Sequence, residues 1–288
     1  MAPSDLQALL TSHAELVYAG IVVFALIIGS FLNVVILRLP VMMDRAWRQE
    51  CRAVLDSPEI SGLQGEVSLI YPPSTCPHCS HRIRPLENIP VVSWLAMRGR
   101  CSACNERVSI RYPLVETLSA VLAVAVIWKL GLIWQAGAAL LFTWALLALT
   151  VIDLDHQLLP DSITLPLLWL GLVINAHGTF VPLASALWGA VFGYLTLWSV
   201  YWAFKLATGK EGMGFGDFKL LAALGAWTGW MALPTIVLLS SFLGAVAGIC
   251  MMAFRGMSRG TPFPFGPFLA AAGWVTLLWG SDLQRYWP

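Results

Sequence analysis

Charged side chains are scarce in this chain. Only 11% of its 288 residues are Asp, Glu, Lys or Arg, whereas a soluble domain has about 25%. The formal net charge is only +1, so the chain has no strong field of the kind that attracts nucleic acid. With 58% hydrophobic residues and a mean hydropathy of +0.74, the composition excludes an ordinary soluble domain. It predicts an integral membrane protein in contact with lipid.

Other common signals are also missing. The sequence has no internal repeat and no low-complexity tract. It has no GxGxxG-type loop, so that motif cannot place a nucleotide-like cofactor. No Lys or Arg precedes Arg38, and the first apolar run is longer than the roughly 7–15 residues of a signal peptide. We therefore expect this first run to be a retained helix.

Long apolar segments are what the sequence does contain. Each is near the length of about 20 residues that crosses a bilayer as a helix. The sequence predicts an all-α polytopic membrane protein with about eight transmembrane helices. The expected spans are 17–38, 114–132, 135–152, 163–177, 183–205, 218–232, 234–254 and 265–280.

The distribution of basic residues predicts an orientation. Arginines gather between residues 38 and 52, directly after the first span, so this loop should lie inside and the N-terminus outside. Threading eight spans from that start leaves only Lys129 and Arg285 outside. We expect three parts: an N-terminal transmembrane helix (1–39), a cytoplasmic domain (40–112) and a seven-helix membrane domain (113–288).

The cytoplasmic domain holds five of the six cysteines. Four of them form two CxxC pairs with twenty-one residues between the pairs, a spacing that can present four thiolates tetrahedrally to Zn²⁺. Disulfides or free thiols are the alternative, but a cytoplasmic location is reducing. We expect a small zinc-ribbon-like domain whose zinc is structural, because four thiolates leave no open position. The expected ligands are Cys76, Cys79, Cys101 and Cys104.

Two acidic residues lie at the predicted cytoplasmic ends of different spans. Asp153, followed by Asp155, ends a span, and Asp217 begins one after a glycine-rich stretch. Ionisable groups at the membrane edge are usually functional. Two carboxylates that share a proton can activate a water molecule and protonate a leaving amine, as in an aspartyl hydrolase. Gly214 and Gly216 would let an extended peptide approach closely.

Simpler interpretations of these residues stay open. Asp217 could be only an N-cap of the helix that follows, and Asp161 is best read as a cap. Asp155 could be a solvated residue at the membrane interface. Gly189, Gly193 and Gly225 could form a face that receives a substrate helix, or could serve packing between the chain's own helices.

Several motifs resemble the type IV prepilin peptidase family. They include "GSFLNVVILRLP" (29–40), the paired CxxC, "RPLENIPVVSWL", "IDLDHQLLPD" (152–161), "GKEGMGFGDFKLLAALGAW" (209–227) and "GTPFPFGPFLAAAGW" (260–274). By this resemblance Asp153 and Asp217 fall on the family's two catalytic aspartates. Gly216 falls on the glycine of its Gly-Asp signature.

The resemblance implies two activities in the bacterial inner membrane. One is cleavage of the basic leader of type IV prepilins and pseudopilins, after a glycine, at the cytoplasmic face. The other is methylation of the new N-terminal residue, often Phe, from S-adenosylmethionine, an activity attributed to the cytoplasmic domain. Gly99 resembles a position linked with methyl transfer, though it could equally be a turn glycine.

Two other functions are compatible with a membrane protein of this kind. A proton- or cation-coupled transporter would need carboxylates deep within spans of both halves. A non-enzymatic assembly scaffold would use the cysteine domain for docking and would tolerate loss of both aspartates. The position of the acids at cytoplasmic span ends favours the hydrolase.

Overall fold

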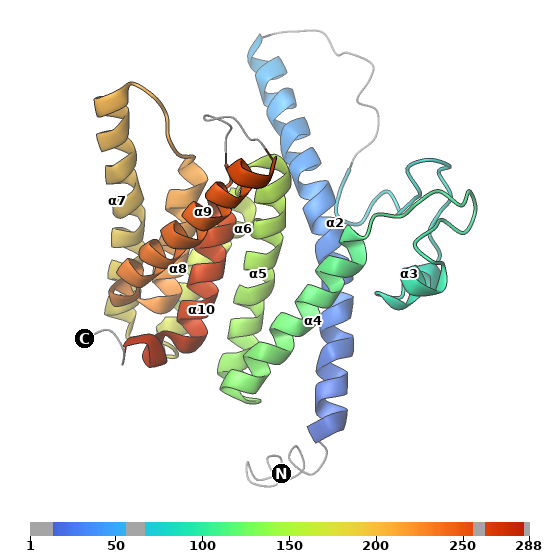
Figure 1. The fold of residues 1–288 in the computed structure, drawn as a ribbon, viewed down its shortest axis with the longest axis horizontal. Coiled ribbons are helices and arrows are strands. Elements are labelled where there is room, and N and C mark those ends of the chain that lie inside the picture. Colours follow the sequence, from blue (N-terminus) through green and yellow to red (C-terminus); the bar gives the residue numbers. More distant parts are fainter. Residues whose placement is uncertain (1–13, 56–66, 256–262, 285–288) are drawn as a thin grey trace. The chain divides into compact units, whose positions relative to one another are not determined.

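The computed structural model describes residues 14–55, 67–255 and 263–284, and these are mostly helical (Figure 1). Helices occupy all eight segments that the sequence predicts, so the all-α class is confirmed. Among the described residues the only extended pairs are two isolated β-bridges in the cysteine segment. The long helices are α2 (Ala14–Leu55), α4 (Arg111–Leu130), α5 (Trp134–His156), α6 (Asp161–Asn175), α7 (Leu183–Thr208), α8 (Phe215–Thr228), α9 (Leu233–Arg255) and α10 (Gly266–Gln284), and the short ones are η1 (Pro85–Asn88), α3 (Val92–Ala96) and η2 (Trp230–Ala232).

Five of the described helices are long and apolar enough to cross a membrane: α2, α4, α5, α7 and the stretch that contains η2 and α9. The apolar parts of α6 and α10 are shorter, and α8 has only 14 residues. At about 1.5 Å per residue, a helix of that length covers about 21 Å, less than the roughly 30 Å of a bilayer core. The chain is therefore a multi-pass membrane protein, and among its described helices α6, α8 and α10 are the short ones.

The chain forms two compact units, residues 1–128 and 129–288. In the first unit, α2 runs without a break through Pro40 to Leu55. It crosses α4 at small residues: a Cβ on Gly29 would lie 2.7 Å from the Cα of Glu116, and Ser119 donates a hydrogen bond of 2.7 Å to the carbonyl of Ala25. These contacts hold α2 and α4 close together.

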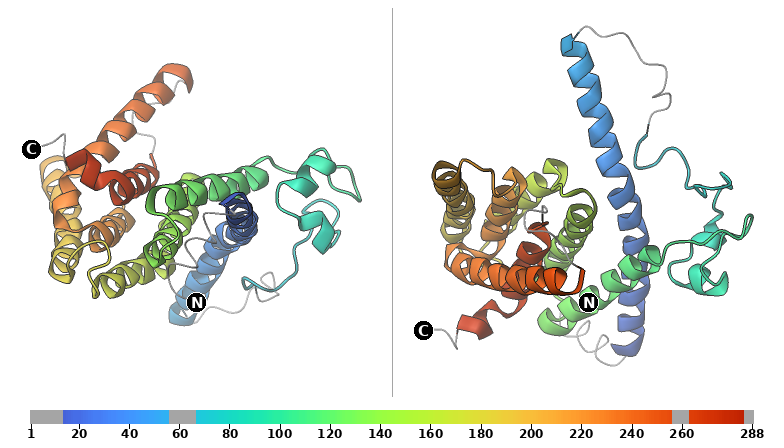
Figure 2. Two further views of the ribbon diagram at one scale, coloured as in Figure 1. Left: turned by 90° about the horizontal axis from the view of Figure 1, so that it is seen from below. Right: turned by 45° about the horizontal axis from the view of Figure 1, so that its top comes forward.

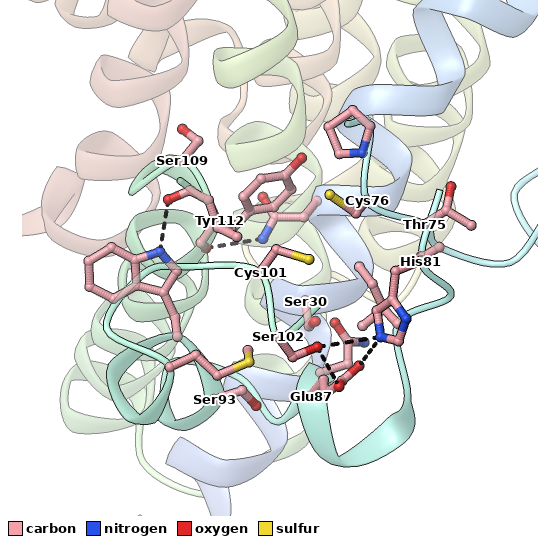
Figure 3. Close-up of a pocket in the computed structure, with 18 of the residues that line it drawn as sticks. Ser30, Thr75, Cys76, His81, Glu87, Ser93, Cys101, Ser102, Ser109 and Tyr112 are labelled. Atoms are coloured by element: carbon pink, nitrogen blue, oxygen red, sulfur yellow. Dashed lines mark hydrogen bonds and ion pairs between the residues drawn. The ribbon is translucent and has the colours of Figure 1, made fainter. Parts of the chain in front are cut away.

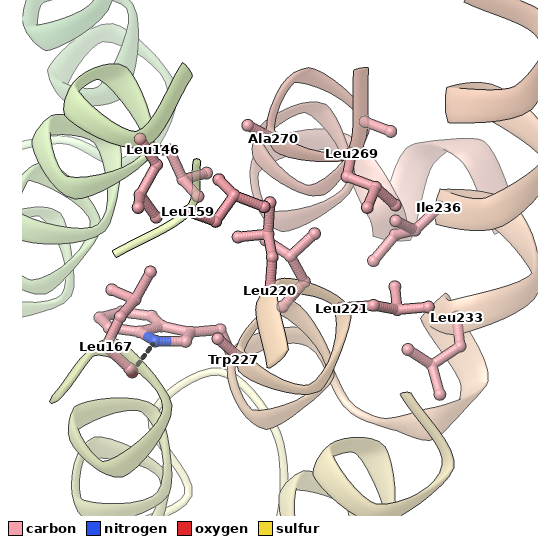
Figure 4. Close-up of a cluster of buried hydrophobic side chains, with 14 of the residues drawn as sticks. Leu146, Leu159, Leu167, Leu220, Leu221, Trp227, Leu233, Ile236, Leu269 and Ala270 are labelled. Atoms are coloured by element: carbon pink, nitrogen blue, oxygen red, sulfur yellow. Dashed lines mark hydrogen bonds between the residues drawn. The ribbon is translucent and has the colours of Figure 1, made fainter. Parts of the chain in front are cut away.

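The second unit is built around α8, which packs against α6, α7 and α10. Apart from Lys219, every residue of α8 from Asp217 to Trp227 is buried. A helix that is apolar on all sides must be surrounded by others, and Figure 2 gives two further views of the helices around α8. Figure 4 shows the centre of the cluster, where Leu220, Leu221 and Trp227 of α8 meet side chains of the neighbouring helices.

Glycines bring α7 and α8 into backbone contact. A Cβ on Gly189 would meet the carbonyl of Gly225, and one on Gly193 would lie 2.6 Å from the carbonyl oxygen of Leu221. All three glycines are buried in this crossing. The sequence leaves open whether these glycines receive a substrate helix or serve packing within the chain. In the structure they serve packing between α7 and α8.

The order of the helices brings several termini to one end of this unit. Four residues separate the end of α5 from the start of α6, and the α6 residue Asp161 accepts a hydrogen bond from Lys219 in the second turn of α8. The first residue of α10, Gly266, bonds to Asp153 near the end of α5. The N-termini of α6, α8 and α10 therefore lie at the same end as the C-terminus of α5.

Candidate active site and metal centre

Asp153 lies in the last turn of α5 with only 5% of its surface exposed. Its Oδ2 accepts a hydrogen bond of 3.1 Å from the backbone N–H of Gly266. A side chain at Gly266 would not fit, because its Cβ would lie 2.6 Å from this same oxygen. The Asp153 carboxyl group is thus held by the N-terminus of α10, the positive end of that helix's dipole.

Asp217 lies in the first turn of α8 and is 8% exposed. The N-cap of α8 is Gly214, so the alternative that Asp217 is the cap is wrong. The backbone of Gly214 is a hydrogen-bond partner of the Asp217 carboxyl group, which also interacts electrostatically with Asp153. The fold thus brings together two buried acids that lie on separate helices.

Leu159 packs between two glycines beside these acids. A Cβ on Gly216 would lie 2.8 Å from Leu159 Cβ, and a Cβ on Gly266 would lie 3.2 Å from Leu159 Cδ2. Gly214 is exposed, next to the Asp217 carboxyl group. The sequence patterns do not single out Leu159 or Gly266 as site residues. The one available signal was the Gly-Pro pair at the start of the last predicted helix.

Polar contacts around the site hold the start of α8. Lys219 lies 2.6 and 2.8 Å from the two carboxylate oxygens of Asp161, which ties α8 to α6. Asp161 follows the N-cap residue Pro160 and is therefore not the cap that we expected. In the loop before α8, Glu211 accepts a hydrogen bond of 2.8 Å from Lys205. The side chain of Asp155 is exposed.

The four cysteines of the two CxxC pairs come together in the first unit. Their sulfur atoms all lie within 4.8 Å of one another, and the Sγ atoms of Cys76 and Cys104, like those of Cys79 and Cys101, are 3.9 Å apart. A disulfide needs about 2.05 Å, so these cysteines are not bonded in pairs. Four ligands at about 2.3 Å from a tetrahedral metal ion would be separated by nearly this distance.

The electrostatics of the cluster also fit a cation. Hydrogen bonds from the backbone N–H groups of Cys79 and His78 lower the pKa of the Cys76 thiol to about 7. A backbone hydrogen bond at Glu106 lowers the pKa of Cys104, but desolvation and the neighbouring sulfurs outweigh it and raise this pKa to about 12. Several thiolates can therefore coexist here only with a positive charge among them.

Glu87 joins the two cysteine pairs. Its carboxylate accepts a hydrogen bond of 2.9 Å from the backbone N–H of Arg84. It also accepts one of 2.8 Å from the Ser102 hydroxyl and lies 3.2 Å from His81 Nε2 (Figure 3). The Arg84 and Ser102 hydrogen bonds and the nearby His81 lower the pKa of Glu87 to about 2. His81 follows the first pair and Ser102 lies within the second. The Glu87 carboxylate therefore links the segments that carry the two CxxC pairs.

Gly99 supports the indole ring of Trp94. It has φ +66°, and a Cβ there would lie 2.8 Å from Trp94 Cζ2. The indole Nε1 donates a hydrogen bond of 3.1 Å to the carbonyl of Val108. Among the described residues that line the neighbouring cavity, Trp94 is present and Gly99 is not. The structure thus places Gly99 behind the cavity wall.

This cavity, of about 540 Å³, lies within the first unit, between α2, the cysteine segment and the start of α4 (Figure 3). One of its walls is strained. Val91 has φ +60° and ψ −47°, a region that costs a β-branched residue of order 1–3 kcal/mol. The backbone N–H of Val91 donates a hydrogen bond of 2.7 Å to Glu116, which is 7% exposed.

Comparisons with known proteins find similarity in both the N-terminal and the C-terminal part of the chain. The family model "Bacterial Peptidase A24 N-terminal domain" matches residues 23–130, and the "Type IV leader peptidase family" model matches residues 140–249. Proteins named "Prepilin leader peptidase/N-methyltransferase" are similar over nearly their whole length. That of Stutzerimonas stutzeri is 60% identical over 91% of this chain and 90% of the relative. That of Pseudomonas aeruginosa is 56% identical over 96% and 95%. That of Dichelobacter nodosus is 50% identical over 98% and 99%. No solved structure matches the chain.

A helical multi-pass protein with two buried carboxyl groups at one end of its bundle has the features expected of a membrane aspartyl hydrolase. With relatives of this identity and coverage, the chain belongs to the type IV leader peptidase family.

Proposed function

We propose that this protein cleaves the leader of type IV prepilins and then methylates the N-terminus that cleavage exposes. The pairing of Asp153 and Asp217 carries the first part. Both are buried, they come from different helices, and their carboxyl groups interact. The names of the relatives support both activities.

Cleavage requires a water molecule between the two acids. With one carboxyl group ionised and the other protonated, the first takes a proton from water while the oxygen attacks the peptide carbonyl. The protonated partner gives its proton to the leaving amine. Gly266 N–H holds Asp153 in place, and the backbone at the exposed Gly214 and the partly exposed Gly216 offers a surface that an extended peptide can approach. Asp155, exposed at the end of α5, would support substrate binding.

The proposed orientation places this end of the second unit at the cytoplasmic face of the bacterial inner membrane. The loop that holds most of the arginines then lies inside, and the N-terminus lies in the periplasm. Residues 1–13 and Arg285 lie outside the described residues. The functional parts are an anchoring helix (1–39), a zinc-binding and methyltransferase-associated domain (40–112) and a peptidase domain (113–288).

The metal at the four cysteines is proposed to be a structural Zn²⁺. Its ligands would be Cys76, Cys79, Cys101 and Cys104, whose separations fit a tetrahedral ion. Four protein ligands leave no position for substrate. A segment with few buried apolar residues needs such an ion to stay folded.

The methyl donor is proposed to be S-adenosylmethionine, which supplies an activated methyl group on a sulfonium ion. The cavity of about 540 Å³ is within the usual range of about 300–1,000 Å³ for such ligands. Trp94 and Tyr112 give it aromatic walls, whose faces suit a cationic donor. Gly99 would act by holding Trp94 in the wall.

The substrates would be prepilins of type IV pili or pseudopilins of type II secretion. Cleavage leaves a new amine at the cytoplasmic end of a membrane helix. A methyl donor bound in a cytoplasmic domain can reach this amine without the product leaving the membrane surface.

The two alternative functions are less well supported. Among the described residues, the buried acids are Glu116, Asp153 and Asp217. Each lies within about two turns of a helix end, whereas a transporter needs acids in the middle of its spans. A scaffold would give no reason to bury two interacting carboxyl groups, since buried charge is costly.

The test uses purified protein with a full-length prepilin in detergent or lipid. Asp153→Asn and Asp217→Asn, made separately, should each reduce leader cleavage about 10²- to 10⁴-fold. Both variants should still methylate a substrate that was cleaved beforehand, which shows that they are folded. Asp282→Asn is the matched control, because Asp282 lies at the other end of α10 in an ion pair with Lys129. Normal cleavage by either variant at the pair would refute the assignment.

A further inference from the structure

The cavity of the first unit contains one buried carboxylate without a known role. Glu116 is the sixth residue of α4, lines this cavity, and is 7% exposed. An acid at this position in a membrane helix is costly unless a partner or a ligand compensates for its burial.

The protein itself satisfies only part of this carboxylate. Glu116 Oε2 accepts a hydrogen bond of 2.7 Å from Val91 N–H, and the Ser30 hydroxyl is its second partner. An ionised carboxylate can accept about four hydrogen bonds. Neither of its partners among the described residues carries a positive charge. The nearby Arg38 is used elsewhere, since it donates to the carbonyls of Ser68 and Pro72 at 3.0 and 2.6 Å.

The other acids that line the cavity do not share this situation. The carboxylate of Glu87 is already engaged by Arg84 N–H, the Ser102 hydroxyl and the His81 ring. Glu106 is exposed to solvent. Glu116 is therefore the acid that is both buried and open to a cationic ligand from the cavity.

The surroundings of Glu116 indicate what kind of cation it would bind. It lies about 7.5 Å along α4 from the first residue of the helix, among Val91, Tyr112 and Pro113 of the cavity wall. These walls suit an ammonium group that carries an apolar or aromatic side chain. In the proposed reaction, that group is the N-terminus of a membrane helix whose leader has been removed.

We propose that Glu116 binds the α-amino group exposed by leader cleavage and takes the proton that this group must lose before it can be methylated. This inference rests on the proposed function. It places the substrate amine that accepts the methyl group beside Glu116 in the cavity.

The chemistry balances as follows for each methyl group transferred. The bound ammonium group gives one proton to the Glu116 carboxylate and becomes an amine. Its lone pair then forms the N–C bond to the methyl group of a sulfonium donor, while the C–S bond breaks and its electron pair stays on sulfur. The products are a methylated ammonium group, a thioether and one proton, which Glu116 passes to water.

The first experiment measures binding without methyl transfer. Two synthetic peptides that start with the residue exposed by cleavage, one with a free amine and one N-acetylated, are titrated against the full-length zinc-loaded protein in detergent. The wild type should bind the free amine about tenfold tighter or more. Glu116→Gln should lose this preference while its amide oxygen still accepts the Val91 hydrogen bond. Glu106→Gln, the same change in the same cavity, should keep it.

The second experiment measures both reactions in one preparation. Glu116→Gln should lower the rate of methylation about 10²-fold or more, with leader cleavage and donor binding within threefold of wild type. Glu116→Leu tests the structural alternative. If Glu116 only held Val91, the Gln variant would methylate normally and the Leu variant alone would fail.

Three results would overturn the inference. The wild type could bind the acetylated peptide as tightly as the peptide with a free amine. This result comes from the wild type alone and does not depend on whether a variant folds. Glu116→Gln could methylate within threefold of wild type, or it could lose donor binding and methylation together. A wild type that cleaves but never methylates would instead refute the proposed methyltransferase function.

Discussion

The backbone N–H of Gly266 lies 3.1 Å from Asp153 Oδ2 and fixes this carboxyl group at the N-terminus of α10. The two residues are 113 positions apart in the chain. α10 also packs against α8, which carries Asp217. α10 therefore contacts both α5, which carries Asp153, and α8, which carries Asp217.

Gly266→Ala should therefore impair cleavage selectively. The new Cβ would lie 2.6 Å from Asp153 Oδ2, so the carboxyl group must move. A displacement of about 1 Å at a catalytic group can reduce the rate about 10²-fold, and methylation of a previously cleaved substrate should be unchanged. Gly248→Ala in α9, where a Cβ would meet no atom within 4 Å, is the control. Equal cleavage rates for the two variants would show that Gly266 does not position Asp153.

Gly189→Ala should destabilise the second unit. Its Cβ would meet the carbonyl of Gly225 and force α7 away from α8, which we expect to lower the free energy of unfolding by about 1–3 kcal/mol. Gly248→Ala should have the opposite sign, because alanine is favoured over glycine in a helix by about 1 kcal/mol. Loss of helical circular dichroism during denaturant titration in detergent measures both. A Gly189→Ala protein as stable as wild type would contradict the tight crossing.

The cysteine cluster should hold about one zinc ion per chain, which metal analysis of the purified protein can measure. Cys76→Ser/Cys79→Ser should lose this ion, and the segment between residues 67 and 110 should become sensitive to proteases. The double change Cys51→Ser/Cys250→Ser removes two cysteines that are not in the cluster and should change neither property. If the wild-type protein contains no metal, the zinc assignment is wrong.

The link made by Glu87 should give the cysteine domain a pH-dependent stability. The pKa of Glu87 is about 2 in the folded protein, below its ordinary value of 4.5, because of its hydrogen bonds to Arg84 and Ser102. A carboxyl group with a lowered pKa stabilises the fold above the ordinary value, and this contribution is lost as the pH falls from about 4.5 to about 2.

Thermal unfolding of the wild type and of Glu87→Gln over this pH range tests the prediction. The stability difference between the two should be largest above pH 4.5 and should shrink on acidification. Acid also removes metal from both proteins, and this effect cancels in the difference between the wild type and Glu87→Gln. Glu106→Gln should follow the wild type. A difference that does not change with pH would mean that the hydrogen bonds of Glu87 do not favour its ionised form.

Much of the secondary structure could be predicted because its signals are local. Apolar segments located the eight main helices of the described residues, and the spacing of the CxxC pairs located the sulfur cluster. The same approach misplaced the caps. It favoured Asp161 as an N-cap and left that role open for Asp217, whereas Pro160 and Gly214 occupy those positions. An acid in the first turn and an acid at the cap produce nearly the same sequence pattern.

The sequence by itself determined that this is a helical membrane protein with a cysteine site and with acids at the ends of two apolar segments. Those features depend on hydrophobicity and on spacing within short stretches of chain. Only the tertiary structure decided that Asp153 meets Gly266, that Gly99 lies behind Trp94, and that Glu116 faces a cavity. Contacts between helices that are distant in the chain depend on how complete side-chain surfaces pack, and no local pattern encodes that.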